Sequence, residues 1–401
     1  MHVCIISNLF PPEIIGGAEK HAQADSIELE KRGHDVSVIT TGSSASSSKF
    51  THESDHGVDI YRFRPRNMYA PYDHQEEPFW KKPIQHIIDL WNPHAYRMVR
   101  KQLNTLDPDL IHIHNYSGLS GAVFSAAGGL EIPVVHTLHD YGSMHIRPDM
   151  FEDGEITEPG PLLRPYQVLN NWLIENNVEI ILSPSQFVIS KYNSSGMFEN
   201  VPCKRLPLGI SAETQKETNG GECGGGNSKK RQILYVGQLT YSKGVDVLVE
   251  AVADFDSEDI EVHILGKGPQ KSKLELMASD LENIHIHGFV PEDELKQMYL
   301  EADLTVVPSR WYDNSPMVIY ESFAYGTPVI GSKIGGIPEL IDNGETGYLF
   351  EPENPNQLKN AIEMSLDKID ILKDNLAGQT RTISNHVSEL EQIYLDVSTA
   401  N

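Results

Sequence analysis

The sequence of 401 residues has few cysteines and no long apolar run. Its three cysteines, Cys4, Cys203 and Cys223, are odd in number and far apart, which argues against a disulfide framework or a cysteine zinc site and suits a reducing compartment. No apolar run approaches the roughly 20 residues of a membrane-spanning helix. The chain starts in a strand-like run without a basic leader, so we expect no secretion signal. These features predict a cytoplasmic protein, at most attached to the inner face of the cell membrane.

Basic residues are also scarce, because 32 Lys and Arg stand against 57 Asp and Glu, and the formal net charge is −25. This charge argues against general binding of nucleic acid, whose phosphates it would repel. It fits both a salt-adapted host and an ordinary acidic cytosolic protein. The 17 histidines are scattered along the sequence. We interpret isolated histidines as structural residues, and we predict no metal site.

What the sequence does contain is a regular alternation of strand-like and helix-like segments in both halves. A chain of this length exceeds one ordinary domain. The alternation predicts an α/β fold of two doubly wound parallel sheets with a ligand cleft between them. The glycine-rich segment 211–231 has little to bury and is the predicted linker. It separates a domain of residues 1–210 from a domain of residues 232–379.

The most informative stretch begins with a buried strand predicted over 304–308 and continues into a helix predicted over 317–325. Pro316 suits the first helical position, and Asn314 or Ser315 can cap the helix. A strand that leads into a helix start directs unpaired backbone N–H groups and the positive end of the helix dipole at one spot. The stretch therefore predicts an anion site.

Two charged residues extend this site to a nucleotide. Glu321, one turn into the same predicted helix, offers a carboxylate for the two hydroxyls of a ribose. A second strand-to-helix turn, 237–244, places Lys243 at a helix start, where a cation opposes the dipole. A bound diphosphate would remove this conflict, whereas a plain solvated lysine is the alternative.

The first half carries polar groups where predicted strands end. His114 ends a strand predicted over 109–114, and His139 with Asp140 follows a strand predicted over 132–138. Open parallel sheets bind ligands at this edge, although a strand-end histidine is also a common structural residue. The Gly16-Gly17 turn opens a helix and brings backbone N–H groups near a phosphate, or is simply a tight turn that needs glycine.

These motifs resemble those of the retaining family 4 glycosyltransferases, which have the GT-B fold of two Rossmann-like domains facing a central cleft. The family pattern of an acid, seven positions and then Glu is matched by Asp313 and Glu321, with Asp in place of the usual Glu, and Gly-x-Pro-Val follows at 326–329. The resemblance implies transfer of a hexose or related sugar, with retention, from a UDP- or GDP-sugar. It implies no cofactor and no metal. It also implies that the tail from residue 380 is a helix that packs on the first domain.

The resemblance assigns roles to individual residues. Predicted catalytic residues are His114 near the reacting carbon, Lys243 on the diphosphate, Asp313 on sugar hydroxyls and Glu321 on the ribose. Gln238 stands where relatives usually carry Arg, which removes one fixed charge from the diphosphate. His139 and Asp140 line the acceptor side. The donor-binding set is Gly16, Gly17, Gln238, Gly266, Phe289, Val290, Asn314, Ser315, Pro316, Met317 and Val318.

Segment 61–103 interleaves basic and aromatic residues within an acidic protein. It predicts peripheral contact with anionic lipid headgroups or a lipid-linked acceptor phosphate, or else a helix that packs its aromatic rings inward and solvates its cations. We expect the acceptor to be a glycan or lipid-linked intermediate of cell-surface glycan assembly.

Segments 43–56 and 144–165 are predicted loops, and the second is predicted to form a lid over the acceptor.

Two other functions remain open from the sequence. One is another enzyme of the same fold, a sugar-nucleotide epimerase or a phosphorylase. The other is a non-catalytic protein that binds a sugar nucleotide, which the departures at Gln238 and Asp313 make conceivable.

Overall fold

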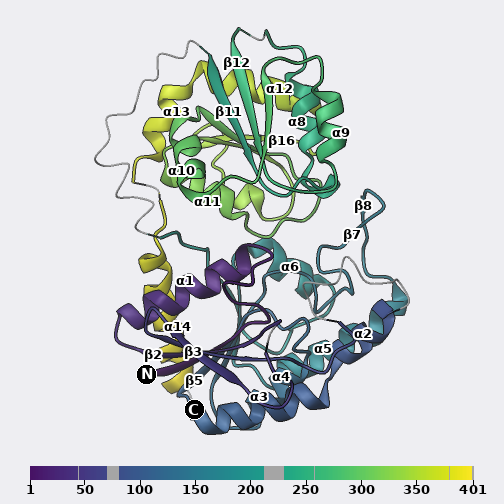
Figure 1. Ribbon diagram of the computed structural model, residues 1–401, viewed down its shortest axis with the longest axis vertical. Coiled ribbons are helices and arrows are strands. Elements are labelled where there is room, and N and C mark those ends of the chain that lie inside the picture. Colours follow the sequence, from purple (N-terminus) through teal and green to yellow (C-terminus); the bar gives the residue numbers. More distant parts are fainter. Residues whose placement is uncertain (44, 70–80, 212–229, 257, 379, 400–401) are drawn as a thin grey trace. The chain divides into compact units, whose positions relative to one another are not determined.

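The computed structural model describes residues 1–43, 45–69, 81–211, 230–256, 258–378 and 380–399 (Figure 1). The chain forms two compact units. The first comprises Met1–Pro148, Glu158–Leu208 and Ile383–Asn401, and the second comprises Asp149–Thr157 and Gly209–Thr382. Most of the predicted linker at 211–231 lies outside the described residues.

The first unit is built on an eight-stranded sheet in the order β10-β9-β6-β5-β1-β2-β4-β3. Every pair is parallel except β3 with β4. The central strands are almost entirely buried, because helices cover both faces of the sheet. The strands are β1 (His2–Ile6), β2 (Asp35–Thr41), β3 (Thr51–Asp55), β4 (Val58–Phe63), β5 (Leu110–Ile113), β6 (Val134–Thr137), β9 (Ile180–Ser183) and β10 (Cys203–Arg205).

The last helix of the chain, α14 (Ile383–Thr399), belongs to this first unit and lies beside α1 (Gly17–Lys31) (Figure 1). Its apolar residues recur at helical spacing, and Val387, Leu390 and Tyr394 enter the core of the unit. Arg32 Nη1 forms an ion pair with Glu391 across the two helices. The other helices of the unit are α2 (Lys81–Leu90), α3 (Pro93–Leu106), α4 (Ala122–Gly128), η2 (Pro161–Leu163), α5 (Arg164–Glu175) and α6 (Gln186–Ser194).

The second unit has a six-stranded, fully parallel sheet in the order β13-β12-β11-β14-β15-β16. Its strands are β11 (Arg231–Val236), β12 (Ile260–Leu265), β13 (Ile284–Gly288), β14 (Leu304–Val307), β15 (Val329–Ser332) and β16 (Gly347–Phe350). Its helices are η3 (Tyr241–Lys243), α8 (Val245–Val252), α9 (Lys271–Met277), α10 (Glu292–Glu301), α11 (Met317–Ala324), η4 (Ile337–Glu339), α12 (Pro355–Asp367) and α13 (Ile369–Leu376). Two helix-covered sheets confirm the predicted α/β fold class.

Some predicted loops are wrong in detail. Segment 43–56 contains β3, an edge strand whose five residues are all exposed, so its polar sequence gave no sign of a strand. Segment 144–165 contains a short hairpin of β7 (Phe151–Glu152) and β8 (Glu155–Ile156), and η2 follows it. Helices α4 and α5 were not predicted.

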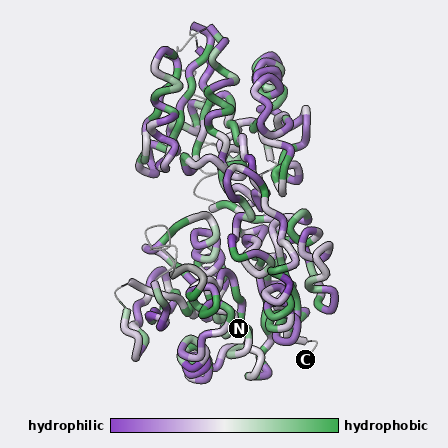
Figure 2. Tube along the Cα trace, turned by 90° about the vertical axis from the view of Figure 1, so that its right-hand side faces the viewer, coloured by the Kyte–Doolittle hydropathy of each residue, from purple (hydrophilic) through white to green (hydrophobic). Residues whose placement is uncertain are grey.

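The helices alternate between hydrophilic and hydrophobic residues along their length (Figure 2). Among the described residues, none of the helices combines the length and the apolar character needed to cross a bilayer.

Candidate active site

The strand order of the second unit changes direction between β11 and β14, which lie side by side at the centre of the sheet. Loops that follow such neighbouring strands part to opposite faces and leave a crevice at the carboxyl edge. The loop after β11 ends in η3, which carries Lys243, and the loop after β14 carries Asp313. The Lys243 Nζ lies 2.5 Å from Asp313 Oδ2, so the fold joins two of the predicted catalytic residues directly.

This ion pair is held from several sides. Ser309 Oγ donates to the same Asp313 oxygen over 3.2 Å, and the Lys243 ammonium lies 4.9 Å from the centre of the Trp311 ring. Lys243 directly precedes Gly244, the N-cap of α8, so a cation does stand at a helix start, but the conflict with the dipole needs no bound anion. Helix α8 begins only at Val245, after a left-handed Gly244, and Asp313 already neutralises the ammonium. The role of Lys243 on a diphosphate stays a prediction.

Glycines bring the two loops into backbone contact. Gly244 has φ 67°, and a Cβ there would lie 1.9 Å from the carbonyl oxygen of Pro308. The Arg310 N–H donates to Ser242 O over 2.8 Å and joins the loops a second time. Any side chain at Gly244 would push the loops apart, so this residue fixes the distance between Lys243 and Asp313.

Helix α11 starts beside this pair, but not as predicted. Met317 is the first helical residue and Pro316 the residue before it, so neither Asn314 nor Ser315 is the cap, and Pro316 does not take the first helical position. Instead, the hydroxyls of Ser315 and Tyr320 hydrogen-bond at 2.8 Å. The start of α11 still presents the N–H groups of its first turn, Met317 and Val318 among them, at the carboxyl edge of β14.

Glu321, in the middle of α11, is half-buried and accepts a hydrogen bond from the Tyr299 hydroxyl at 2.8 Å. Tyr299 is buried on α10 and stacks on Tyr325 at 5.4 Å between ring centres. Burial, and next to it the charge of Glu321, raise the pKa of Tyr299 well above its ordinary value, so the hydroxyl keeps its proton and donates. Sequence reasoning missed Tyr299, because no motif links it to Glu321, 22 positions further along.

The predicted base-binding residues follow the next strands of the same sheet edge. The Gly266 N–H donates to Gly288 O over 2.7 Å, and a Cβ on Gly266 would lie 1.7 Å from Gly237 O. The ends of β11, β12 and β13 are thus packed backbone to backbone. Phe289 follows them with 70% of its surface exposed, and Lys267 Nζ lies 4.7 Å from its ring centre. Val290 is half-buried and Gln238 is exposed.

In the first unit the strand order changes direction between β1 and β5. His114 follows β5 and His139 follows β6, and their rings stack with His114 Nδ1 3.0 Å from His139 Nε2. Burial, and then the neighbouring histidines, hold the pKa of His114 well below its ordinary value and lower that of His139 to about 3. Both rings are neutral at neutral pH, so one nitrogen donates to the other. A neutral imidazole can exchange hydrogen bonds with sugar hydroxyls.

The other predicted residues of the first unit shape turns. The Gly16 N–H donates to Glu19 Oε2 over 2.8 Å, the one hydrogen bond of a capping box that a glycine N-cap can form, at the start of α1, where Gly17 is the first residue. Asp140 Oδ1 accepts from the Gly142 N–H over 2.8 Å and so fixes the turn after His139. The roles of these residues toward donor and acceptor stay predictions.

Two family models match consecutive parts of the chain. A model described as Glycosyltransferase Family 4 matches residues 15–213, and a model described as Glycosyl transferases group 1 matches residues 224–379. The chain belongs to the family 4 glycosyltransferases.

Known proteins resemble this glycosyltransferase over nearly its whole length. An uncharacterised 42.6 kDa protein of the cps region of Klebsiella pneumoniae is 23% identical over 85% of this chain and 87% of its own. Sucrose-phosphate synthase from Thermosynechococcus elongatus has a TM-score of 0.75 at 19% identity, with complete coverage of both chains. Anabaena HepE, solved with UDP, has a TM-score of 0.71 at 16% identity, with 99% of this chain and 100% of that chain covered. The likeness to these two solved structures confirms the GT-B fold.

The fold also gathers residues of this glycosyltransferase that the sequence kept apart. His21 and Asp25 on α1 meet His386 on α14 in the interior of the first unit. The histidines are scattered in the sequence, but the fold brings two of them together beside Asp25. The one sequence signal was the i, i+4 spacing of His21 and Asp25, which places them on one helix face.

Proposed function

We propose that this glycosyltransferase moves a hexosyl group, with retention and without a metal, from a nucleotide-diphosphate sugar to a lipid-linked or cell-surface glycan intermediate. The Lys243–Asp313 pair, where the second sheet changes direction, carries the proposal. A cation and the start of α11 at one sheet edge form a site for a diphosphate. HepE, of the same fold, has been solved with UDP, which supports a UDP-sugar donor.

Donor binding then rearranges the ion pair. The diphosphate takes the place of the Asp313 carboxylate at Lys243 Nζ, and Asp313, still held by Ser309, turns its oxygens to the sugar hydroxyls. Negative charge grows on the diphosphate as the bond to the sugar breaks. Lys243 and the first N–H groups of α11 stabilise that charge, and the loss of one such group costs about a hundredfold or more in rate.

Retention follows if the acceptor attacks the face of the sugar that the diphosphate leaves. A phosphate oxygen of the donor takes the acceptor proton, so no side chain has to act as nucleophile. His114, buried and neutral, is suited to a hydrogen bond with the sugar, and Glu321 to the ribose hydroxyls. Tyr299 is a positioning residue, because it holds one oxygen of Glu321 and leaves the carboxylate oriented before the donor arrives.

An apolar face on the first unit supports a membrane-bound acceptor. Helices α2 and α5 pack against each other (Figure 1), and both expose large apolar side chains. These exposed residues are Ile84, Ile87 and Trp91 on and after α2, and Leu162, Val168, Leu169 and Trp172 on η2 and α5. We call them the α2–α5 apolar face. Exposed apolar side chains in such number suit insertion into a lipid interface.

Segment 61–103 contains both buried and exposed members of its basic and aromatic set. Phe63 and Tyr69 are buried, as the inward-packing interpretation expects. Trp91 is 42% exposed, and Arg64, Arg66 and Arg97 are exposed as well. Tyr72, Phe79 and Trp80 lie outside the described residues. The exposed members favour contact with an anionic bilayer, the surface that carries lipid-linked acceptors.

The test begins with a panel of nucleotide sugars. Each is screened for a rise in the melting temperature of the protein, because a ligand that binds the folded state stabilises it. The stabilising donor is then incubated with candidate acceptors, and the anomeric configuration of the product is determined by NMR. The proposal expects transfer with the donor's configuration. An inverted product contradicts retention. Conversion of the sugar without acceptor identifies an epimerase, and binding without any reaction identifies a non-catalytic protein.

A further inference from the structure

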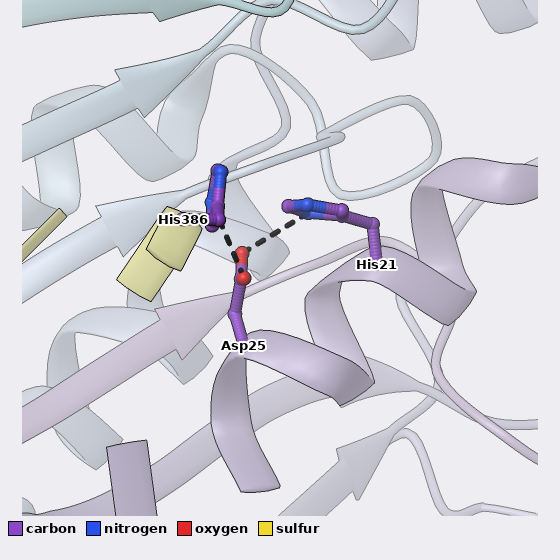
Figure 3. Close-up of side chains that lie close together, drawn as sticks. All are labelled: His21, Asp25 and His386. Atoms are coloured by element: carbon purple, nitrogen blue, oxygen red, sulfur yellow. Dashed lines mark ion pairs between the residues drawn. The ribbon is translucent and has the colours of Figure 1, made fainter. Parts of the chain in front are cut away.

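Three buried side chains meet between the first and last helices of the first unit. His21 and Asp25 lie one turn apart on α1, and His386 reaches them from α14 (Figure 3). Nδ1 of His21 lies 3.1 Å from Asp25 Oδ2, and Nε2 of His386 lies 3.3 Å from Asp25 Oδ1. The three residues are exposed by 3%, 0% and 3%. Each offers one ligand atom, and these atoms lie within 4.8 Å of one another.

These short contacts lack the geometry of hydrogen bonds. Within the part of the chain that the structure describes, neither Asp25 oxygen and neither ring nitrogen of His21 makes a hydrogen bond. A buried carboxylate without such bonds costs several kcal/mol, so a compensating charge is required. Zinc ligands lie about 2.0–2.1 Å from the metal, and at a tetrahedral angle two of them are about 3.3 Å apart. The separations of 3.1 and 3.3 Å, which join the two histidines to different oxygens of Asp25, are close to that between neighbouring ligands.

The tautomer of His386 also suits a metal ligand. Its Nδ1 lies 2.7 Å from the carbonyl oxygen of Pro207, which can only accept, so Nδ1 carries a proton. Nε2 is then the ring atom that faces Asp25 Oδ1, 3.3 Å away, and in the neutral ring its lone pair is available to a cation held between the two groups. A histidine whose second nitrogen donates to a backbone carbonyl is the usual arrangement for a metal ligand.

A cavity of ≈ 10 Å³ adjoins the cluster and is lined by His112, His114 and Thr137 among others. This volume is close to the smallest that holds one water molecule. A water in the cavity can complete a four-coordinate ion.

We propose that His21 Nδ1, the Asp25 carboxylate and His386 Nε2 bind one divalent cation of the zinc class, with a water as fourth ligand. Two imidazoles and one carboxylate are a donor set that such an ion prefers. The ion joins α1 to α14, elements more than 350 residues apart in the sequence, and fixes the last helix to the first unit. It lies in the interior of that unit, separate from the diphosphate site proposed on the second.

Metal uptake by the purified full-length protein tests this directly. The chain is stripped with EDTA, dialysed, and titrated with Zn²⁺ or Co²⁺ alone. We expect about one ion bound per chain by elemental analysis, d–d absorption of the Co²⁺ form with the intensity of a four-coordinate site, and a melting temperature several degrees higher with Zn²⁺. Asp25→Asn and His386→Gln should each weaken binding at least tenfold.

His34→Gln is the matched control. His34 follows α1 and contacts Glu391 on α14 at 2.8 Å, so it joins the same helices without belonging to the cluster. It should bind Zn²⁺ and Co²⁺ as the wild type does. Binding of neither ion by wild type, or equal loss of binding in His34→Gln and Asp25→Asn, overturns the proposal. If the cluster variants do not fold, the wild-type titration decides alone. Nucleotide-sugar stabilisation, measured in parallel, reports on the second unit and fails or succeeds independently.

Discussion

The candidate sites of the two units are built from opposite chemistry. In the second unit, the half-buried Lys243 and the buried Asp313 are charged and paired with each other. In the first, His112, His114 and His136 are buried, and burial holds their pKa values well below the ordinary range, so they are neutral. A charged, exchangeable pair suits a diphosphate, whose own charge replaces one partner. A neutral, desolvated edge suits sugar hydroxyls, which need hydrogen bonds and no counter-charge.

Removal of the cation should produce the largest effect. In Lys243→Ala the departing diphosphate loses its positive partner, and we expect transfer to slow by about a hundredfold or more, or about 3 kcal/mol. The initial rate at saturating donor measures this. Lys359→Ala is the control, because Lys359 contacts Asp254 at 3.6 Å and lies 5.5 Å from the Phe255 ring centre, and both of these residues are outside the predicted site. Equal rates for Lys243→Ala and Lys359→Ala would remove Lys243 from the mechanism.

The positioning residue should matter less than the charge. Tyr299→Phe deletes the hydroxyl that donates to Glu321 and keeps the stacked ring. We expect KM for the donor to rise about tenfold, the worth of one hydrogen bond to a charged group, with kcat changed less. Glu321→Ala should raise KM at least as much. If Tyr299→Phe lowers kcat alone and leaves KM as in the wild type, Tyr299 does not act through ribose binding.

The neutral histidines predict a pH dependence of stability. Burial lowers the pKa of His136 from 6.5 to about 4, outweighing its hydrogen bond to Ile113 O. Below pH 6.5 the unfolded chain therefore binds a proton that the folded chain does not. His136 alone should destabilise the fold by about 1.4 kcal/mol per pH unit between pH 6.5 and 4. Thermal unfolding at pH 7.5 and 5.5 measures this loss.

A variant separates His136 from other titrating groups. Burial raises the pKa of Asp89 to about 6. The contribution of this group to the stability of the fold is therefore lost as the pH rises, which opposes the effect of His136. In His136→Phe the fall in melting temperature from pH 7.5 to pH 5.5 should be smaller than in the wild type, whatever the stability at pH 7.5. An unchanged pH dependence would mean that His136 is protonated in the folded chain.

The apolar face should give the smallest effect. Ile87→Asp combined with Trp172→Asp places charge on side chains that are 68% and 58% exposed, so folding is spared. Sedimentation with vesicles containing anionic lipid should fall several-fold, and charge reversal of Lys81, Lys82 and Arg97 should lower it further. Leu276→Asp with Ile371→Asp, 75% and 58% exposed on the second unit, is the control. Equal binding by both double variants and the wild type would exclude this face from membrane contact.

The sequence predicted most elements because the strands of parallel sheets are buried on both faces and read as short apolar runs. Strand β3 was not predicted, because an exposed edge strand needs no apolar residue and so has no apolar pattern. Lys243, Asp313 and Glu321 were found from motif spacing, but their contacts depend on strand order, which no local pattern contains. The cluster of His21, Asp25 and His386 forms only when α14 packs on α1. The local sequence can therefore indicate only that His21 and Asp25 share a helix face.

Calorimetric titration with UDP and GDP tests the central claim, that Lys243 at the edge of the second sheet binds the donor diphosphate. The account predicts that the wild type binds one of these nucleoside diphosphates, that Lys243→Ala binds it at least about tenfold more weakly, and that the corresponding nucleoside monophosphate shows a smaller difference between the two proteins. Equal affinity of wild type and Lys243→Ala for the diphosphate would contradict it.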